Sequence, residues 1–247
     1  MKIGIMQPYF MPYIGYFQLM NHVDKWVVFD RVQFIDKGWV NRNRILHPDQ
    51  SKQWQFITVP LSKRGQFSNI CDISIHNKQK WQMQVKGKLE YLRKKAPYFR
   101  VTMDWLDECL SSDTTSLSEM LSHSLITTAQ YLGIDTPIVT QSSENIVIDE
   151  AEHAGQWALN IAKFYGANEY VNPCGGVSIF RQSEFDESNI KLSFLETELK
   201  PYTQQRDFVA GLSIIDVLLW NSVSDVKKAL QEDFRIRSHQ ELLDSGK

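Results

Sequence analysis

The sequence predicts an α/β protein with a mainly parallel, doubly wound sheet, and two observations carry that prediction. Short apolar runs of strand length alternate with longer segments of helical periodicity along most of the chain. The opening unit, residues 2–30, has the pattern of strand, loop, helix and strand within about thirty residues, the usual length of a crossover between parallel strands. We expect strands at 2–6 and 25–30, joined by a helix that begins beside Gly15.

The same alternation continues after two interruptions. We expect helices at 117–132, 150–165 and 212–220, and strands at 137–141 and 169–171. The interruptions are a β-rich insert at about 33–76, which we expect to be antiparallel, and a helical insert at about 78–121. No repeat or low-complexity linker divides the chain. These patterns predict a single α/β domain over residues 1–226 with inserts, followed by a charged C-terminal tail at 227–247 that frays.

The composition is that of a soluble globular protein, with 43% hydrophobic and 23% charged residues among 247. A formal net charge of −2 argues against a nucleic-acid partner, because phosphate binding depends on clustered positive charge. The three cysteines and six histidines have no ligand-like spacing, so we expect no metal site and no disulfide framework. No apolar run approaches the roughly 18 residues of a membrane span, and we expect a cytoplasmic protein without membrane insertion.

The first candidate site is the loop that follows the first strand and enters the helix. It contains Gln7, Tyr9, Tyr13, Gly15 and Tyr16. Ligands of open α/β sheets bind beyond the carboxyl ends of the strands, and a helix start there offers unpaired N–H groups to an anion. Gly15 would let the backbone approach that anion, while the tyrosines offer hydroxyls or rings. The alternative is a proline-rich turn whose aromatic side chains cap the core.

The second candidate site follows the next strand along the chain. Asp30 ends that strand at the same sheet edge, and Asn41, Arg42, Asn43 and Arg44 come shortly after it. In an extended segment the two arginines share a face, and two guanidinium groups on one face suit a diphosphate. The alternative is a solvated edge strand whose charges prevent aggregation.

Two further segments supply binding candidates. Asn172, Gly175 and Gly176 follow the strand at 169–171, where two glycines allow a ligand to approach the backbone closely. Gln204 and Arg206 alternate on one face of the extended chain before the helix at 212–220, and we expect them to close the cleft.

One carboxylate stands among apolar residues of the last predicted helix. Asp216 lies between Ile215 and Val217, and its burial requires a hydrogen-bonding partner. It is a candidate catalytic group, and a structural ion pair is the equally favoured alternative.

Several long stretches resemble one protein family in the same order across almost the whole chain. They are MQPYFMPYIGYFQLMNHVDKWVVFDRVQF, GWVNRNRI, YVNPCGG and GLSIIDVLLWN. These stretches are similar to those of the WbqC-like family, which occurs in bacterial O-antigen and capsule gene clusters. The resemblance implies a role in making or modifying nucleotide-linked sugars or their amino substituents.

A second resemblance concerns the fold and the phosphate site. The succession of strand, PYIGY and helix is similar to the HxGH region of HIGH-type nucleotidylyltransferases, with Tyr13 and Tyr16 at the two histidine positions. A tyrosine with a pKa near about 10 carries no positive charge at neutral pH. The positive charge that neutralises the phosphate would then have to come from the helix terminus, Arg42, Arg44 or Arg206.

Two functions therefore stand side by side. The first is a transferase that moves a nucleotidyl, acyl or amino-acyl group on a nucleotide-linked or amino sugar, with Tyr16, Arg42 and Asp216 as catalytic residues and the other candidates as binding residues. Its donor would be a nucleotide or a nucleotide-activated small molecule, with no covalently bound cofactor. The second is a non-catalytic nucleotide-sugar-binding or assembly protein of the same pathway. A homo-oligomer is compatible with either.

Overall fold

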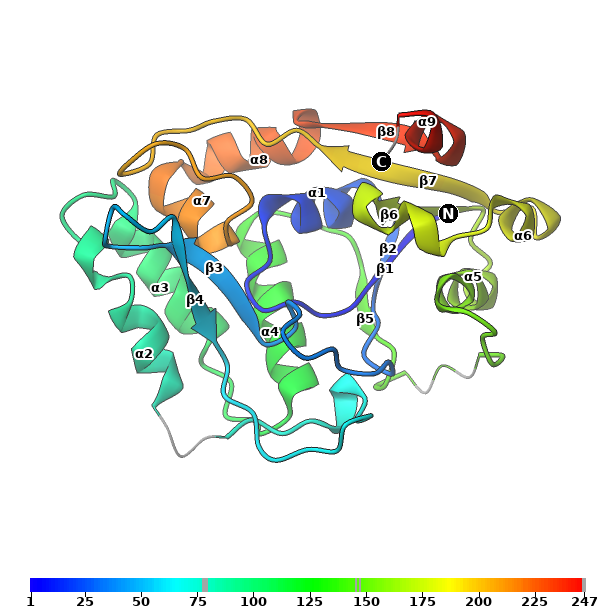
Figure 1. Ribbon diagram of the computed structural model, residues 1–247, viewed down its shortest axis with the longest axis horizontal. Coiled ribbons are helices and arrows are strands. Elements are labelled where there is room, and N and C mark those ends of the chain that lie inside the picture. The colour runs from blue at the N-terminus through cyan, green and yellow to red at the C-terminus, as the bar shows by residue number, and fades with distance from the viewer. Residues whose placement is uncertain (77–79, 145, 147, 246–247) are drawn as a thin grey trace.

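The computed structural model describes residues 1–76, 80–144, 146 and 148–245. Its main sheet has the strand order β5-β2-β1-β6-β7-β8, in which β8 alone is antiparallel to its neighbour. The strands are β1 (Lys2–Met6), β2 (Lys25–Val28), β5 (Ile138–Thr140), β6 (Glu169–Pro173), β7 (Lys191–Thr197) and β8 (Phe234–Ser238). This mainly parallel sheet, flanked by helices, confirms the predicted α/β class and is consistent with a Rossmann-like fold (Figure 1).

The strand order reverses direction beside β1. The chain first adds β2 and then β5 on one side of β1, and afterwards crosses over to place β6 on the other side. β1 and β6 pair in parallel, with Lys2 opposite Glu169 and Gly4 opposite Val171. The loops that leave these two strands run in opposite directions, so a crevice opens at their carboxyl ends. The strand order therefore predicts that a ligand site lies beyond β1 and β6.

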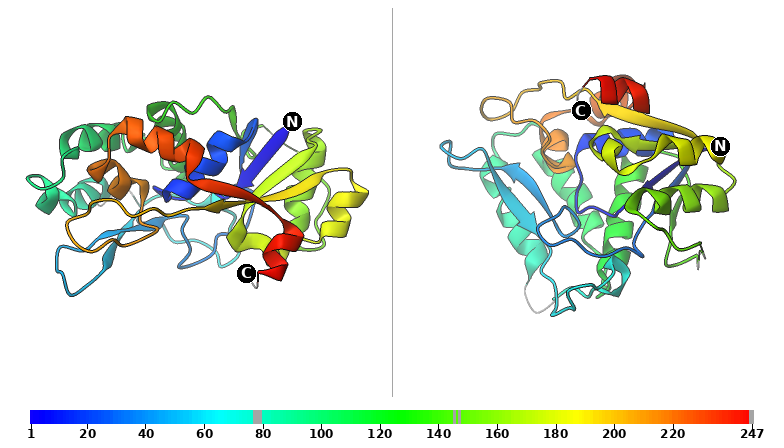
Figure 2. Two further views of the ribbon diagram at one scale, coloured as in Figure 1. Left: turned by 90° about the horizontal axis from the view of Figure 1, so that it is seen from above. Right: turned by 45° about the vertical axis from the view of Figure 1, so that its right-hand side comes forward.

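Helices cover both faces of the sheet (Figure 2). On one face α1 (Ile14–His22) and α4 (Leu117–Tyr131) pack against Trp26 and Val28 of β2. On the other face α5 (Ala154–Phe164), α6 (Gln182–Glu187) and α9 (His239–Asp244) pack against Ile3 and Ile5 of β1. Because parallel strands are buried on both faces, β1 is apolar along its whole length except at its first residue.

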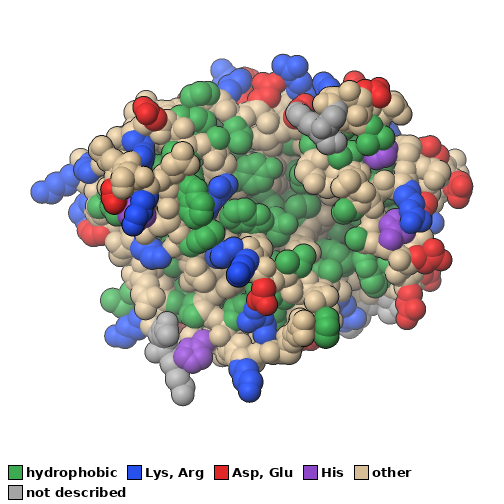
Figure 3. Space-filling view, in the orientation of Figure 1, with side chains coloured by type: hydrophobic (Ala, Val, Ile, Leu, Met, Phe, Trp, Pro, Cys, Tyr) green, Lys and Arg blue, Asp and Glu red, His purple; other side chains and the backbone are tan. Residues whose placement is uncertain are grey.

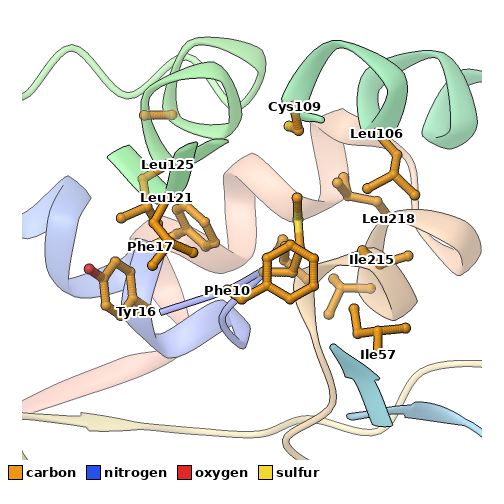
Figure 4. Packing of buried hydrophobic residues seen from close by; sticks show 14 of the residues in the cluster. Phe10, Tyr16, Phe17, Ile57, Leu106, Cys109, Leu121, Leu125, Ile215 and Leu218 are labelled. Atoms are coloured by element: carbon orange, nitrogen blue, oxygen red, sulfur yellow. The ribbon is translucent and has the colours of Figure 1, made fainter. Parts of the chain in front are cut away.

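The two predicted inserts extend the hydrophobic cluster on the face of the sheet that α1 and α4 cover. β3 (Arg42–Leu46) and β4 (Trp54–Thr58) form a separate antiparallel hairpin. Further helical segments are η1 (Ile70–Asp72), α2 (Trp81–Gly87), η2 (Glu90–Leu92), α3 (Phe99–Cys109), α7 (Ile214–Trp220) and α8 (Val223–Glu232). Figure 4 shows Phe10 and Phe17, from the first loop and α1, within one cluster with Leu121, Leu218 and Ile57. Residues 78–79 of the predicted helical insert lie outside the described residues.

The C-terminal segment corrects one expectation. We expected a fraying tail from Lys227, but α8 continues to Glu232, β8 pairs with β7, and α9 follows. Leu242 of α9 is fully buried, and Arg235 forms an ion pair with Glu198. The apolar residues among the charges find partners on the sheet, so the segment folds. Residues 246–247 of the predicted tail lie outside the described residues.

Among the helices of the described ranges, none combines the length and the apolar character that crossing a membrane requires.

Candidate functional site

A cavity of about 660 Å³ opens at the carboxyl ends of β1 and β6. Its walls come from the loop after β1, the hairpin strand β3, the first turn of α5, and the segment after β6 that forms η3 (Cys174–Ile179). Two residues of the segment between β7 and α7, Leu199 and Gly211, complete the wall. Figure 3 shows the hollow, with hydrophobic side chains gathered around it. The three stretches that the sequence singled out, near residues 10, 43 and 174, therefore meet at one place.

The loop after β1 divides its side chains between core and cavity. Phe10 and Met11 are buried in the core, while Tyr9 and Tyr13 line the cavity. Met11 has a φ of 45°, in the left-handed region that a residue with a side chain rarely adopts. Packing of Phe10 and Met11 therefore holds the loop in a strained turn, and this turn places both tyrosines at the ligand side.

The tyrosines of this loop sit in surroundings that keep them neutral. Burial raises the pKa of Tyr9 and of Tyr13, and raises that of Tyr16 well above its ordinary value. Tyr16 is 1% exposed, and its hydroxyl donates a hydrogen bond to the backbone oxygen of Gln7 at 3.1 Å. Tyr16 and Gln7 both line the cavity. The Tyr16 hydroxyl thus fixes the start of the loop, while Tyr9 and Tyr13 offer ring faces and hydroxyls.

The N-terminus of α1 points its backbone at this loop. No side chain caps the helix at Tyr13, so its first N–H groups are left without a side-chain acceptor. Gly15 does not face open space, because a Cβ there would lie 2.3 Å from Thr197 Oγ1. Gly15 is absent from the residues that line the cavity. The glycine therefore allows close packing under the loop, and the helix terminus supplies the positive end of its dipole.

β3 brings one arginine and one amide to the cavity. Asn43 is buried and donates from Nδ2 to the backbone oxygen of Phe10 at 3.0 Å, which ties the hairpin to the first loop. Arg44 lines the cavity beside it. The Arg44 Cζ lies 5.1 Å from the ring centroid of Trp39 and 5.4 Å from that of Trp54. Two indoles thus hold the guanidinium in place by cation–π contacts.

The Arg44 guanidinium keeps unused hydrogen-bonding capacity. Its Nη2 donates to the backbone oxygen of Gly211 at 3.3 Å. Its Nε is buried and has no hydrogen-bond partner among the described residues. Arg44 is the only Lys or Arg among the described residues that line the cavity. An oriented guanidinium beside an apolar cavity is suited to a carboxylate or phosphate.

The neighbouring candidates on the hairpin are engaged elsewhere. Arg42 stacks its guanidinium on Phe56 at 4.1 Å and donates to the backbone oxygens of Lys37 and Gly38. Asn41 donates to the backbone oxygen of Val59 at 2.9 Å. Arg42 and Asn41 are absent from the cavity lining. The structure thus separates the two arginines that we expected to act together, and places only Arg44 at the cavity.

The segment after β6 contributes a tethered amide and two glycines. The Tyr170 hydroxyl donates to Asn172 Oδ1 at 2.7 Å, and Asn172 Nδ2 donates to the Pro173 oxygen at 2.8 Å. A Cβ on Gly176 would lie 2.4 Å from Asn172 Nδ2, whereas Gly175 has open space. All five residues line the cavity. The predicted Asn172, Gly175 and Gly176 thus lie in one wall, with the amide held by its neighbours.

Asp30 is a structural junction at the end of β2. Its side chain is fully buried and accepts hydrogen bonds from Ser118 Oγ at 2.6 Å and from the Ser142 backbone N–H at 3.0 Å. It is absent from the cavity lining. Asp30 therefore joins the end of β2 to α4 and to the loop after β5.

The segment between β7 and α7, residues 198–213, is called the strap here, and a buried carboxylate anchors it. Asp216 Oδ2 accepts hydrogen bonds from Tyr202 Oη at 2.7 Å and from Gln204 Nε2 at 2.6 Å. Burial raises the pKa of Asp216 to about 6, although these two donors act in the opposite direction. Burial likewise raises the pKa of Tyr202. Asp216 and Gln204 are absent from the cavity lining, so they position the strap.

Arg206 fastens the other side of the strap to the β3–β4 hairpin. Its guanidinium donates to the backbone oxygens of Asp49, Gln50 and Lys52 in the turn of the hairpin. Arg206 is absent from the cavity lining. The strap thus spans from α7 to the hairpin, and its two cavity residues, Leu199 and Gly211, are held between these anchors.

The sequence did not single out several aromatic residues of the cavity. Trp157, Phe29, Tyr170 and Phe180 line it together with Trp39. Trp157 belongs to the first turn of α5, and the helix before a parallel strand begins at the carboxyl edge of the sheet. An aromatic residue in that first turn was the signal that could have identified it.

The cavity lacks the usual acid–base groups. Among the described residues that line it, none is a histidine, cysteine, lysine, aspartate or glutamate. The described ranges also contain no group of three or more histidine, cysteine, aspartate or glutamate side chains close enough to hold a metal ion. Proton transfer at this site would depend on tyrosine hydroxyls or on the ligand itself. The orientation of a ligand would depend on Arg44, Asn43 and Asn172.

Comparisons with known proteins cover most of the chain. An uncharacterized protein of Mycobacterium tuberculosis is 29% identical over 220 residues, which cover 88% of this chain and 92% of the relative. No solved structure matches the chain. Residues 7–228, which include the loop after β1, the hairpin, η3 and the strap, match the WbqC-like protein family. The chain therefore belongs to the WbqC-like family.

Proposed function

We propose that the cavity binds a nucleotide-linked sugar or a similarly activated acyl donor, and that the protein is a transferase acting on such a molecule in surface-polysaccharide assembly. The observation that carries the proposal is the position of Arg44 beside an aromatic cavity at the point where the strand order reverses. Doubly wound sheets bind nucleotides at such points.

The cavity provides the two kinds of surface that a nucleotide needs. Tyr9, Trp39 and Trp157 give flat apolar faces suited to a base or to the carbon face of a sugar ring. Arg44 and the uncapped start of α1 provide positive charge for a phosphate. A volume of about 660 Å³ lies within the range of about 300–1,000 Å³ typical of small-molecule sites.

We also propose that the unit of β1 and α1 is related to the HxGH region of HIGH-type nucleotidylyltransferases. Tyr13, Ile14, Gly15 and Tyr16 begin α1 directly after the loop from β1, at the place that the HxGH motif occupies in HIGH-type nucleotidylyltransferases. We propose a shared ancestry of this unit. Since the pKa of both tyrosines is raised by burial, they stay uncharged, and nucleotidyl transfer would lack the imidazolium charge of those enzymes.

Calorimetric titration tests the binding step. UDP, GDP, dTDP and UDP-N-acetylglucosamine are each titrated into the wild-type protein, Arg44→Ala, Arg42→Ala and Arg93→Ala. Hydrogen bonds to a charged group contribute about 1.5–3 kcal/mol, so Arg44→Ala weakens the best ligand about tenfold or more. Arg93, exposed and paired with Glu90, is the matched control for loss of one charge.

Each outcome of the titration has a defined meaning. Loss of affinity with Arg44→Ala alone supports the site as described. Equal loss with Arg42→Ala means that the turn at Lys37 and Gly38, which Arg42 holds, is needed to place Trp39. No binding of any nucleotide, or unchanged affinity in Arg44→Ala, refutes the proposal.

A non-catalytic nucleotide-sugar-binding protein is the second candidate, and one observation favours it. The described lining contains no carboxylate, histidine, cysteine or lysine that could act as a general base. Incubation of the protein with the ligand found above and with amino-sugar acceptors, followed by mass spectrometry, separates the two. Transferred product that disappears in Tyr9→Phe or Tyr13→Phe supports catalysis, whereas binding without any turnover supports the second candidate.

A further inference from the structure

Two neighbouring loops carry the most exposed large apolar side chains that the structure describes. These loops, residues 31–41 after β2 and residues 61–69 after β4, are called the loop pair here and lie side by side (Figure 1). Phe67 is 75% exposed and Ile35 is 61% exposed. Single apolar side chains are common on protein surfaces, but two of this exposure on adjoining loops indicate a contact surface.

Contacts between the two loops hold them together. The Phe34 N–H donates to the Ser68 oxygen at 3.0 Å. Arg64 forms an ion pair with Asp36, and its Cζ lies 4.5 Å from the centroid of the Phe34 ring. These contacts join the two segments, so their exposed apolar side chains belong to one surface.

The turn in the first loop presents a lysine from a strained backbone. The Gly38 N–H donates to the Ile35 oxygen at 3.2 Å, which closes a four-residue turn. Lys37, the third residue of this turn, has a φ of 62°, a conformation that turns usually assign to glycine or asparagine. Arg42 donates to the backbone oxygens of Lys37 and Gly38 and so holds the turn. Because a left-handed lysine costs backbone strain, its place at an exposed turn points to a role for the side chain.

The loop pair has a charge opposite in sign to that of the whole chain. The chain has a formal net charge of −2. The loop pair contains four cations and one carboxylate, which gives +3, and these are Arg31, Lys37, Lys63, Arg64 and Asp36. Asp36 pairs with Arg64, whereas Lys37 and Lys63 are exposed and form no ion pair within the described ranges. Cationic and apolar side chains therefore occur together on a protein that is slightly acidic as a whole.

We propose that the loop pair docks on an anionic lipid surface. Phe67 and Ile35 enter the headgroup layer, while Lys37 and Lys63 contact the lipid phosphates. Anionic bilayers attract basic residues near their surface, and proteins that bind them peripherally combine such residues with exposed aromatic and aliphatic ones. The contact requires no membrane-spanning helix.

A protein partner fits this surface less well. A specific protein interface buries about 800 Å² on each partner, around a centre that is poor in charged residues. The loop pair has three exposed large apolar side chains, those of Ile35, Trp39 and Phe67, among five charged residues. A headgroup layer accepts separate apolar side chains with cations between them.

The loop pair adjoins the main cavity. Trp39 directly follows the turn, is 39% exposed, and lines that cavity. Docking therefore brings this wall of the cavity close to the lipid surface. The inference does not rest on the proposed function, because Ile35, Lys37 and Phe67 are absent from the cavity lining.

Vesicle cosedimentation of the full chain tests the proposal. The vesicles contain phosphatidylcholine alone or mixed with phosphatidylglycerol, and binding is measured at low salt and at about 1 M salt, where the Debye length is only about 3 Å. We expect no binding to phosphatidylcholine alone, and binding to the mixed vesicles that falls at least about tenfold at high salt. Absence of binding to the mixed vesicles overturns the proposal in favour of a protein partner. Equal binding to both kinds of vesicle also overturns it, because charge would then play no part.

Paired variants locate the contact. Phe67→Ser removes the most exposed apolar side chain, and Met83→Ser makes a similar change at a 60% exposed position of α2. Lys37→Asn removes one charge and suits the left-handed turn, while Lys94→Asn removes one exposed charge before α3. Binding to the mixed vesicles should fall about fivefold in each loop variant and stay unchanged in each control, with thermal denaturation showing that all four fold. Equal binding within either pair overturns the proposal.

Discussion

The ring of Tyr13 packs directly on Gly15, and a Cβ on residue 15 would lie 2.5 Å from two carbons of that ring. The absence of a side chain at Gly15 therefore makes room for the ring of Tyr13, which lines both the main cavity and a second, smaller one. Its position at the start of α1 had suggested a close approach to phosphate. The contact with Tyr13 gives a different reason for a glycine at the same place.

Gly15→Ala is expected to destabilise the protein, although alanine favours a helix over glycine by about 1 kcal/mol. The added methyl group must displace Tyr13 and Thr197, and such overpacking costs about 1–3 kcal/mol. Gly87→Ala, near the end of α2 where a Cβ meets open space, is the matched control and should be neutral or stabilising. Thermal denaturation compares the two, and equal melting temperatures would contradict the role given to Gly15.

Asp216 predicts a pH dependence of stability. Burial raises its pKa from 3.8 to about 6, so the fold favours the protonated carboxyl. Its contribution to the free energy of unfolding is present below the unfolded pKa of 3.8 and is lost as pH rises through about 6. The loss amounts to about 3 kcal/mol at about 1.36 kcal/mol per pKa unit.

Asp216→Asn removes this titration and keeps an oxygen for Tyr202 and Gln204. Urea denaturation at pH values of about 4 and about 7 measures the free energy of unfolding. Relative to wild type, the variant should gain about 2 kcal/mol between the two pH values, because at a pH of about 4 the unfolded carboxyl is already partly ionised. Asp113→Asn, at an exposed position, should follow the wild-type curve. A constant difference between Asp216→Asn and wild type would show that this carboxyl does not titrate in that range.

Leu242 and its neighbour Leu243 test the folded C-terminus. Leu242 is 0% exposed and Leu243 is 50% exposed, although both belong to α9. Leu242→Ala should lower the free energy of unfolding by about 2–5 kcal/mol, because it leaves a cavity against the sheet. Leu243→Ala should change it by less than about 0.5 kcal/mol. Similar small effects at both positions would mean that this segment frays after all.

Arg206 tests how firmly the strap is held. Arg206→Ala removes the hydrogen bonds to Asp49, Gln50 and Lys52, and should speed hydrogen exchange and protease cleavage in residues 198–211 several-fold. The melting temperature should change little, because these contacts are exposed. Arg93→Ala serves as the control. Unchanged exchange in the strap would mean that Asp216 and its partners hold it alone.

Local patterns predicted the central unit of the fold. β1, α1 and β2 begin and end close to the predicted positions because each has a clear apolar pattern, and Pro8, Pro12 and Gly15 mark the end of β1 and the start of α1. The same reasoning placed Tyr9, Asn43 and Asn172 near one sheet edge, since loops after parallel strands emerge on the same side.

Tertiary packing decided what the patterns could not. Arg42 and Arg44 share a face of β3. Arg42 nevertheless donates hydrogen bonds to the turn at Lys37 and Gly38, whereas Arg44 lies against two indole rings from separate segments. Nothing in the RNR pattern distinguishes them. Asp216 similarly depends on Tyr202 and Gln204, which reach it from a strap without regular structure.

The C-terminal segment was misjudged for a related reason. Its charges resemble those of a solvated tail, but Arg235 and Arg237 pair with Glu198 and Glu196 at the end of β7. A charged residue on an edge strand is neutralised by its cross-strand neighbour, which a linear pattern does not reveal. The signal in the sequence was the capping box of Ser238 and Glu241, which begins a helix that contains Leu242.

The pairing of β1 with β6 sets the order in which the protein can mature during synthesis. Met1 and Asn168, which lie 167 residues apart, are joined by a hydrogen bond beside these strands. The wall formed by the loop after β1 is synthesised well before the opposite wall, which follows α5 in the sequence. Contacts of such long range form slowly. The crevice is complete only after Gly211 has been synthesised, because Leu199 and Gly211 close its wall.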